Sequence, residues 1–280
     1  NHVWMRHTGE PIVPTVFDFG LNGRPPTNPK LLDFLACELV DHGWSLKHVH
    51  RLIVTSATYR MASGPADEAT RAAYAANTAL EPDNKMCWRA NVRRLESEAV
   101  RDSVLYVAGR LDVMPGGPEL GQDDWQSTTR RSLYYRNAQD KQGTFAVVFD
   151  APPPNECYRR AETVTPQQAL ALANSPLAVA SARVLAADLT KAVGPPAEKD
   201  AAFVAAAFDR VLCRPPTAEE SADCAAFVAA QAKSLADAKQ LTTLGGTDAA
   251  TVTAANDPRQ RARESLVHVL MNHNDFVTVR

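Results

Sequence analysis

The sequence predicts a mainly α-helical protein, a multi-helix globular domain with a small β element and long irregular loops in the middle. Apolar residues recur at three- and four-residue steps in several segments, which is the spacing of one helix face. Residues that cap helices stand directly before proline at four places, and this pairing is typical of helix starts. The alternation of strand and helix patterns that marks an α/β protein is absent. We therefore expect one mainly helical domain over residues 1–280.

The first part of this domain, at about residues 28–112, is expected to hold three helices. One begins at Asn28-Pro29 and ends at Gly43, and Ser45 caps the next. Their buried faces are expected to consist of Leu31, Leu32, Leu35, Leu39 and Val40, and of Leu46, Val49, Leu52 and Ile53. The third helix is expected from about residue 93 to residue 111. Its inward residues are Val100, Val104, Val107, Ala108 and Leu111, and its outward residues are Arg94, Glu98 and Arg101.

The second part, at about residues 113–164, is expected to be an insert of loops and short strands. It is rich in Pro, Gly, Asp and Gln, and SLYY (132–135) and FAVVF (145–149) are its strand candidates. The third part, at about residues 165–280, is Ala-rich. Helices are predicted there at about 166–174, 176–192, 198–212, 217–236 and 258–273, and a mobile loop at 237–256. Thr217 and Glu220 have the spacing of a capping box.

Composition and charge exclude several classes of protein. Hydrophobic residues make up 45% of the chain and charged residues 22%, which is ordinary for a globular protein, and the net charge of −2 argues against a dedicated nucleic-acid binder. No apolar run approaches the roughly 20 residues of a membrane span. The chain opens at Asn1 without a charged-then-apolar leader. Because it starts directly in the aromatic-rich NHVWMRHTGEPIV, we expect a fragment whose N-terminus lies upstream.

The 5 cysteines give no sign of a metal or haem site. They are widely spaced, without C-x-x-C or C-x-x-C-H, so zinc ribbons and covalent c-type haem are not expected in this segment. Cys37 is expected to be a small core residue. One disulfide is compatible with the odd count.

No complete catalytic motif is present, so no reaction is predicted. DFG at 18–20 lacks the other kinase motifs and is read as a turn. His48 and His50 stand two residues apart on a helix and point in different directions, so no metal site is predicted from them. The carboxylates of Glu96, Glu98 and Asp102 could take part in acid–base chemistry, but neighbouring arginines favour an ion-paired face.

Arginine pairs give the best candidate for a binding site. The three pairs are Arg93-Arg94, Arg130-Arg131 and Arg159-Arg160, and the last two flank the irregular middle, close to tyrosines. Guanidinium groups and aromatic rings on loops recognise anions and sugar faces. The predicted ligand-binding residues are Arg130, Arg131, Tyr134, Arg159 and Arg160. The alternative is that these arginines fasten loops to helix ends, and the excess of Arg over Lys also fits a GC-rich genome.

Several segments in order along the chain resemble a known family. They include DFGLNGRPPTNPKLLDFLACELVDHGWSLKHVHRLIVTSATYR (18–60), RRLESEAVRDSVLYVAGRLD (93–112), RRSLYYRN (130–137), FDAPPPNECYRRAETVTPQQALALANS (149–175), RVLCRPPTAEE (210–220) and HVLMNHNDF (268–276). In these segments the chain resembles domain of unknown function 1553, the planctomycete PSD-type domain. The likeness spans essentially the whole chain, with only the start of the family domain cut off before Asn1.

What this resemblance implies is mostly context. Family members are typically exported proteins of planctomycetes and related bacteria, at the periplasm or cell surface. The domain commonly follows a cytochrome-c-like domain, so haem c is expected upstream in the parent chain and no cofactor in this segment. Neighbouring genes often encode sulfatases and other functions in polysaccharide degradation. The family has no established catalytic residues.

Three functions follow as hypotheses. The first is a module that engages anionic or sulfated glycans, with the arginine pairs and tyrosines as contacts. The second is a helical scaffold for a surface protein complex. The third is the substrate-pocket domain of a haem-linked oxidoreductase, in which Trp44, His50 and Tyr59 line the interface with the haem domain. No nucleic acid and no membrane span are expected.

Overall fold

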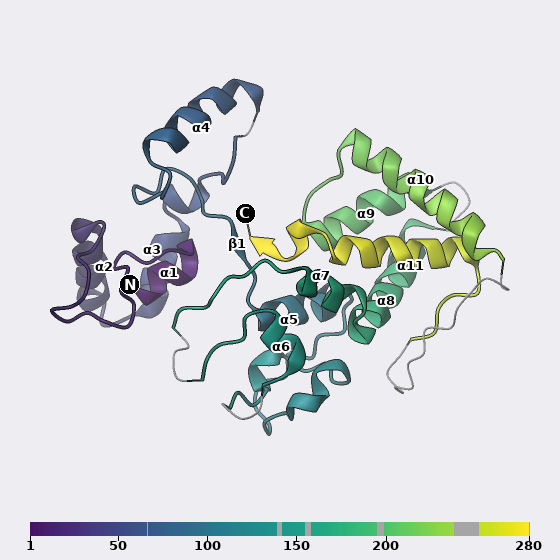
Figure 1. The fold of residues 1–280 in the computed structure, drawn as a ribbon, viewed down its shortest axis with the longest axis horizontal. Helices are drawn as coiled ribbons and strands as arrows, with labels where there is room; N and C mark the ends of the chain where they lie inside the picture. The colour runs from purple at the N-terminus through teal and green to yellow at the C-terminus, as the bar shows by residue number, and fades with distance from the viewer. Residues whose placement is uncertain (66, 139–141, 155–157, 195–198, 238–251, 280) are drawn as a thin grey trace. The chain divides into compact units, whose positions relative to one another are not determined.

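The computed structural model describes residues 1–65, 67–138, 142–154, 158–194, 199–237 and 252–279 (Figure 1). The described chain is mainly helical, which confirms the predicted fold class. Contacts between residues divide it into two compact units. Unit 1 comprises residues 1–94, 156–159 and 278–280, and unit 2 comprises residues 95–155 and 160–277. That residues 1–280 act as one domain stays a prediction.

Unit 1 is built on a helix hairpin. Its elements are α1 (His2–Thr8), α2 (Pro29–Asp41), α3 (Leu46–Val54), the 3-10 helix η1 (Thr58–Arg60), α4 (Glu68–Leu80), and the strands β1 (Arg93–Arg94) and β2 (Thr278–Val279). Trp4, Ile12, Val49 and Ile53 form its buried core, and Leu31, Leu32, Leu35 and Leu39 pack against it. The predicted apolar faces of α2 and α3 are thus confirmed, except that Val40 and Leu46 lie exposed at the hairpin end.

The hairpin turn depends on two consecutive residues with left-handed backbone. Gly43 has φ of 65° and Trp44 has φ of 62°, a region that non-glycine residues seldom adopt. The amide of Trp44 donates to the carbonyl of Leu39 (2.7 Å), which closes the end of α2. The Ser45 hydroxyl then accepts from the amide of His48 (3.3 Å) and starts α3. As predicted, Gly43 follows one helix and Ser45 caps the next.

Two helices of unit 1 were not predicted, and the predicted burial of one cysteine was wrong. These helices are α1 and α4, and α4 begins with a capping box in which Asp67 and Thr70 satisfy each other's backbone amides. Cys37 was expected in the core and is exposed, because it lies on the side of α2 away from α3 and α1. Residues 18–20 form a turn as expected, with the amide of Gly20 donating to Oδ1 of Asp18 (2.9 Å).

Unit 2 is a helical bundle with a loop-rich layer. Its helices are α5 (Ser97–Val107), α6 (Thr144–Val148), α7 (Pro166–Ala173), α8 (Pro176–Val193), α9 (Asp200–Leu212), α10 (Ala218–Leu235) and α11 (Pro258–Met271), with the 3-10 helices η2 (Gln122–Gln126), η3 (Ser132–Tyr134) and η6 (Asn274–Phe276). Figure 1 shows α11 lying along α8 and α10. The shared core includes Val104, Leu105, Phe203, Val267 and Met271, all nearly inaccessible to solvent.

The Ala-rich helices agree with the prediction to within about two residues at each end. Ser175, Thr217 and Asp257 cap them with side-chain hydrogen bonds, whereas Thr165 makes none. Most of the predicted mobile loop, residues 238–251, lies outside the described residues. The four described cysteines, Cys37, Cys87, Cys213 and Cys224, are free thiols. In the described ranges no single helix has the length and apolarity to cross a membrane, and the bent pair α7–α8 meets that test by length and composition alone.

Three local predictions were wrong. The helix expected at 93–111 spans only 97–107, because Arg93 and Arg94 pair with Val279 and Thr278 in the antiparallel two-strand sheet. The strand candidate 132–135 is mostly the 3-10 helix η3, and 145–149 overlaps α6. A short apolar run fits either type of element, and here the pairing of residues 132–135 is limited to an isolated bridge between Tyr135 and Leu120. Arg101 was expected on the outer side of its helix and is fully buried, because the 122–135 loop covers that side.

Candidate functional site

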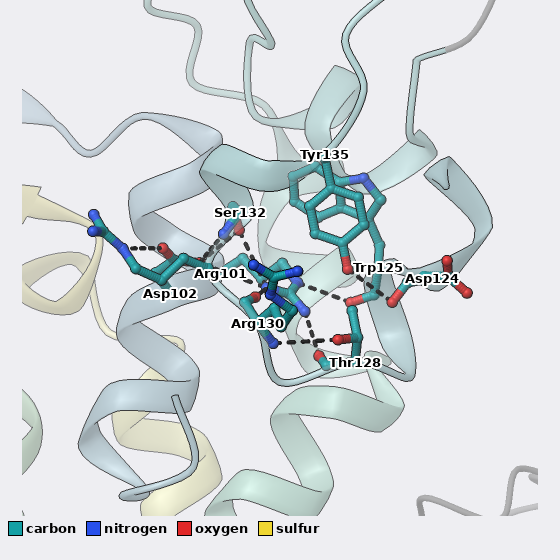
Figure 2. Close-up of polar contacts among 9 residues, drawn as sticks. Arg101, Asp102, Asp124, Trp125, Thr128, Arg130, Ser132 and Tyr135 are labelled. Carbon is teal, nitrogen blue, oxygen red and sulfur yellow. Dashed lines mark hydrogen bonds and ion pairs between the residues drawn. The ribbon is translucent and has the colours of Figure 1, made fainter. Parts of the chain in front are cut away.

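The predicted residues Arg130, Arg131 and Tyr134 lie on a loop that is fixed to α5 by the buried Arg101. The guanidinium of Arg101 donates to the carbonyls of Trp125 (2.9 Å), Arg130 (2.8 Å) and Thr128 (2.5 Å) and to the hydroxyl of Ser132 (3.2 Å). Figure 2 shows Arg101 in the middle of these acceptors. Its donors thus satisfy backbone carbonyls of a mostly irregular segment, in which regular pairing is sparse among the described residues.

Aromatic and acidic side chains also hold this loop against α5. Oδ1 of Asp102 accepts from the amide (2.8 Å) and the hydroxyl (2.6 Å) of Ser132. The rings of Trp125 and Tyr135 stack with centroids 4.6 Å apart, and the Arg101 guanidinium lies 5.1 Å from the Tyr135 ring. Burial raises the pKa of Tyr135 to about 12, so its hydroxyl stays protonated and donates to the carbonyl of Asp124 (2.9 Å). The cluster is a structural anchor.

On the exposed side of the same loop, Arg130 also contacts an aromatic ring and donates to backbone carbonyls. Its guanidinium lies 4.1 Å from the ring centroid of Tyr134 and donates to the carbonyls of Gly116 and Pro118. The Tyr134 hydroxyl accepts from the amide of Gly116 (2.8 Å). Gly117 has φ of +97°, and a Cβ there would lie 2.9 Å from Nη1 of Arg130, so the close approach requires glycine. Arg130 and Tyr134 therefore close the 116–118 turn.

The remaining predicted residues are separated. Arg131, 48% exposed, approaches Asp102 only to 3.8 Å. Arg160 forms a two-pronged ion pair with Glu98 (3.0 and 3.2 Å), and although burial acts to raise the pKa of Glu98, hydrogen bonds from Arg160 prevail and lower it. Arg159 belongs to unit 1, where it lies 3.8 Å from Glu10. The structure thus brings together Arg130, Arg131 and Tyr134, and it places Arg159 and Arg160 in different contacts.

A different group of polar side chains surrounds a cavity of about 140 Å³ in unit 1. We call it the His7–Arg93 pocket. It is lined by His7, Thr8, Thr58, Tyr59, Met61, Asn84, Cys87, Arg89, Ala90, Asn91, Arg93 and Val279. This lining contains two arginines and a histidine and no carboxylate. The pocket thus has positive charge without an acidic partner in its wall.

Side-chain hydrogen bonds to backbone carbonyls and a two-residue sheet position the groups that line this pocket. Asn84, buried and with φ of 52°, donates to the carbonyl of Arg89 (2.8 Å) and to Oδ1 of Asn91 (2.9 Å). Asn91 donates to the carbonyl of Thr8 (3.0 Å), and Nη1 of Arg93 donates to that of Arg6 (2.6 Å). These carbonyls end α1 and have no partner within the helix. Pairing of Arg93 with Val279 places β2 in the pocket wall.

Several guanidinium hydrogens at the pocket remain available. Nε of Arg89 is buried without a hydrogen-bond acceptor in the described chain, while Nη2 donates to the carbonyl of Pro82 (3.2 Å). Among the described residues, the guanidinium of Arg93 makes no hydrogen bond besides that to the carbonyl of Arg6. A buried donor without an acceptor costs free energy, about 1–3 kcal/mol for a neutral group and more for a charged one. Nε of Arg89 has no accessible surface, so contacts of this arginine with an anion in the pocket would have to come from its Nη groups.

Two histidines and a tyrosine meet at the edge of this pocket. Nε2 of His7, on α1, lies 2.7 Å from Nδ1 of His50, on α3, and the ring of Tyr59 stands edge-on to His7 at 5.9 Å. One nitrogen of the His7–His50 pair must carry the shared proton and the other must accept it, so both rings cannot be fully protonated while this bond exists. Burial lowers the pKa of His7, and His50 and Arg93 lower it further.

Sequence reasoning found only part of this pocket. His50 and Tyr59 were singled out from their polarity, and the structure brings both to His7, whereas Trp44 lies exposed on the α2–α3 turn and does not line the pocket. Arg93 was noted as one member of an arginine pair. Arg89, Asn84 and Asn91 were not predicted. The remaining signal was the segment P-D-N-K-M-C-W-R-A-N (82–91), which carries several polar residues between a helix and a strand.

Comparison with known proteins gives one family. The model of the family described as "Protein of unknown function (DUF1553)", PSD1, matches residues 1–228, which includes all pocket residues except Val279. No curated protein and no solved structure matches the chain.

Proposed function

The chain belongs to the DUF1553 family, and we propose that it is a binding module that holds the anionic group of an acidic or sulfated saccharide in the His7–Arg93 pocket. One observation carries this proposal. The wall of that pocket contains Arg89, Arg93 and His7 and no carboxylate, and hydrogen-bond donors of both arginines have no acceptor among the described residues. Guanidinium groups bind sulfate and carboxylate oxygens through paired, charge-assisted hydrogen bonds.

The size and composition of the pocket support a saccharide substituent as the bound group. A volume of about 140 Å³ is smaller than the roughly 300–1,000 Å³ of sites that enclose drug-sized ligands, so it fits one substituent of a longer molecule. Tyr59 is exposed at its rim and offers an aromatic face to a sugar ring. Asn84, Asn91 and Thr58 add amide and hydroxyl groups.

The side-chain chemistry supports binding more than catalysis. Cys87 lies in the wall, but burial raises the pKa of its thiol and Glu81 raises it further. A protonated thiol is a poor nucleophile. Arginine side chains as a class present fixed N–H donors in a planar fork, which suits capture of an anion.

The test compares this pocket with the loop predicted from sequence. Calorimetric titration would measure binding of a sulfated disaccharide and of its unsulfated parent to the purified chain. We expect the sulfated form to bind more tightly, and Arg89→Met with Arg93→Met to weaken it at least tenfold, since hydrogen bonds to charged groups contribute about 1.5–3 kcal/mol. Arg71→Met is the control, because Arg71 is exposed and its ion pair among the described residues is with the exposed Glu68.

Two outcomes would decide against the pocket. Equal affinity for both disaccharides would show that the chain does not recognise the anionic group. If the Arg130→Ala, Arg131→Ala double variant bound the sulfated disaccharide more weakly and the pocket variants did not, the binding site would lie on the 130–134 loop. Circular dichroism of each variant would show that its fold is retained.

Family resemblance supports a proposal about the surroundings of this module. We infer an exported, planctomycete-type parent protein in which a cytochrome-c-like domain with its own C-x-x-C-H motif lies upstream. Haem c would belong to that domain. Sequencing the coding DNA upstream of Asn1 tests this inference, since a signal peptide and C-x-x-C-H are expected there. Their absence from the complete reading frame would remove both export and electron transfer from the proposal.

One observation favours a scaffold as the second candidate. Large apolar side chains are exposed in the first part of unit 1, among them Phe17, Phe19, Leu21, Phe34 and Trp44. Exposed apolar groups of this kind are common at protein–protein interfaces. If the chain bound no acidic saccharide and instead co-purified with one defined protein, with loss of that partner in Phe19→Ser, the scaffold would replace the binding module.

A further inference from the structure

The α2–α3 hairpin brings three metal-ligating side chains to one point. Glu38 and His42 stand four residues apart at the end of α2, so they lie on the same face, and His48 lies in the first turn of α3. One potential ligand atom from each residue lies within 4.8 Å of the other two. The left-handed backbone at Gly43 and Trp44 makes this convergence possible, because it returns the chain directly to α2.

Both histidines direct a ring nitrogen toward one carboxylate oxygen. Oε2 of Glu38 lies 2.7 Å from Nε2 of His48 and 3.4 Å from Nδ1 of His42. The two rings are stacked, with centroids 3.6 Å apart and an angle of 11° between their planes. Adjacent ligands of a tetrahedral zinc ion lie about 3.3 Å apart, given Zn–N and Zn–O bonds near 2.0–2.1 Å. The ligand atoms are thus close enough for one ion, and the stacked rings must tilt out of their parallel arrangement so that both nitrogen lone pairs point to it.

We propose that Glu38, His42 and His48 bind one divalent transition-metal ion of the zinc class. Two imidazoles and one carboxylate favour Zn²⁺, Co²⁺, Ni²⁺ or Cu²⁺ over Mg²⁺ and Ca²⁺, which prefer all-oxygen sites. Nδ1 of His42 also lies 3.0 Å from the backbone carbonyl of Glu38, a hydrogen bond that Nδ1 gives up if it is the nitrogen that binds the ion. The side chains are 26–47% exposed, so an ion can enter and a fourth ligand can come from water.

The role of such an ion would be to lock the hairpin. It would join the end of α2 to the start of α3, and α3 also carries His50, which contacts His7 of the His7–Arg93 pocket. The metal site shares no residue with that pocket, so metal binding can be tested independently of saccharide binding.

The experiment uses the tag-free chain, stripped of metal with a chelator and titrated with Zn²⁺ and with Co²⁺. We expect one ion per chain, a visible Co²⁺ absorption band that Zn²⁺ displaces, and a higher melting temperature with Zn²⁺. His48→Ala and Glu38→Gln should each weaken Zn²⁺ at least tenfold. His50→Ala is the matched control, since it removes a histidine from the same helix outside the cluster and should leave Zn²⁺ affinity unchanged.

Either of two results would overturn the proposal. One is wild-type Zn²⁺ affinity in both His48→Ala and Glu38→Gln. The other is loss of Zn²⁺ binding in His50→Ala with binding retained in His48→Ala, which would place the ion at the His7–His50 pair. Circular dichroism without metal separates loss of the site from loss of the fold.

Discussion

Arg263 and Asp200 form a buried ion pair in which both Nε and Nη2 of the guanidinium donate to Oδ1 of the carboxylate, at 3.2 and 3.0 Å. The pair joins α11 to the first residue of α9. Nη1 of Arg263 also donates to the hydroxyl of Thr190 on α8 (3.2 Å), so three helices meet at one guanidinium. Arg263 is fully buried, and its charge has no access to water.

Asp200→Asn is expected to destabilise unit 2 strongly. The neutral amide would leave the buried Arg263 and the neighbouring Arg259 without their anion, and breaking a buried pair in this way costs about 3–5 kcal/mol. Urea unfolding followed by circular dichroism measures the loss. Asp188→Asn is the control, because its pair with Lys191 is exposed and should change stability by no more than about 0.5 kcal/mol. A loss below about 1 kcal/mol in Asp200→Asn would contradict this assignment.

Arg101→Met is expected to release the 122–135 loop from α5. The variant keeps the apolar volume but leaves the carbonyls of Trp125, Thr128 and Arg130 without their donor, at a cost of about 3 kcal/mol. Limited proteolysis should cut the loop faster, and tryptophan fluorescence should shift to the red as Trp125 gains contact with water. The exposed Arg136, 3.9 Å from Glu119, provides the control in Arg136→Met. Unchanged proteolysis in Arg101→Met would show that the loop holds without it.

Binding of a sulfated saccharide should strengthen as the pH falls. Burial lowers the pKa of His7 in the free chain, and an anion in the pocket favours the protonated ring and raises that pKa. Affinity should therefore rise as the pH drops through the bound-state pKa and level off below the free-state pKa. Calorimetry at pH 5, 6, 7 and 8 measures this trend. His7→Gln should flatten it, and an equally steep trend in that variant would assign the proton to another group.

Acid stability should depend on the capping box of α10. Hydrogen bonds from Arg214 and from the backbone of Thr217 lower the pKa of Glu220 to about 2, against 4.5 in the unfolded chain. Since the folded-state pKa is depressed, this stabilisation is complete above about pH 4.5 and is lost as the pH falls through about 2. The Glu220 side chain is 31% exposed and lies at the surface, so solvent screening limits this stabilisation to about 1 kcal/mol. Urea unfolding between pH 2 and pH 7 should show wild type and Glu220→Gln converging at low pH. A constant difference would contradict the prediction.

Much of the helical framework could be predicted from the sequence, because its signals are local. Asn28, Ser45, Ser175, Thr217 and Asp257 all cap helices with their side chains, as their positions before an apolar repeat predicted. A capping residue acts within three residues of itself, so its effect is readable without knowledge of the rest of the chain. The helix α4 was missed because its box uses Asp67 and Thr70 in place of the usual Ser or Thr followed by Glu.

The errors arose where distant residues decide the outcome. Arg93 and Arg94 fit a helical pattern but pair with Val279 and Thr278. Arg101 looked like an exposed charge, but the loop it fastens begins more than twenty residues later. The His7–Arg93 pocket combines residues from four separate segments, and no spacing in the sequence joins them. The Glu38–His42–His48 cluster was missed because His48 was compared with His50 on its own helix and not with the helix before.

The two-residue sheet also determines when the His7–Arg93 pocket can form during synthesis of the chain. Arg93 and its strand partner Val279 lie at distant points of the chain, and at ~5–20 residues per second Arg93 leaves the ribosome about 10–40 s before Val279. During that interval the N-terminal segment can form its helices, but the pocket lacks one wall. If the pocket binds an anion as proposed, it can do so only after translation has passed β2, and a nascent chain held before that point should bind the anion less tightly.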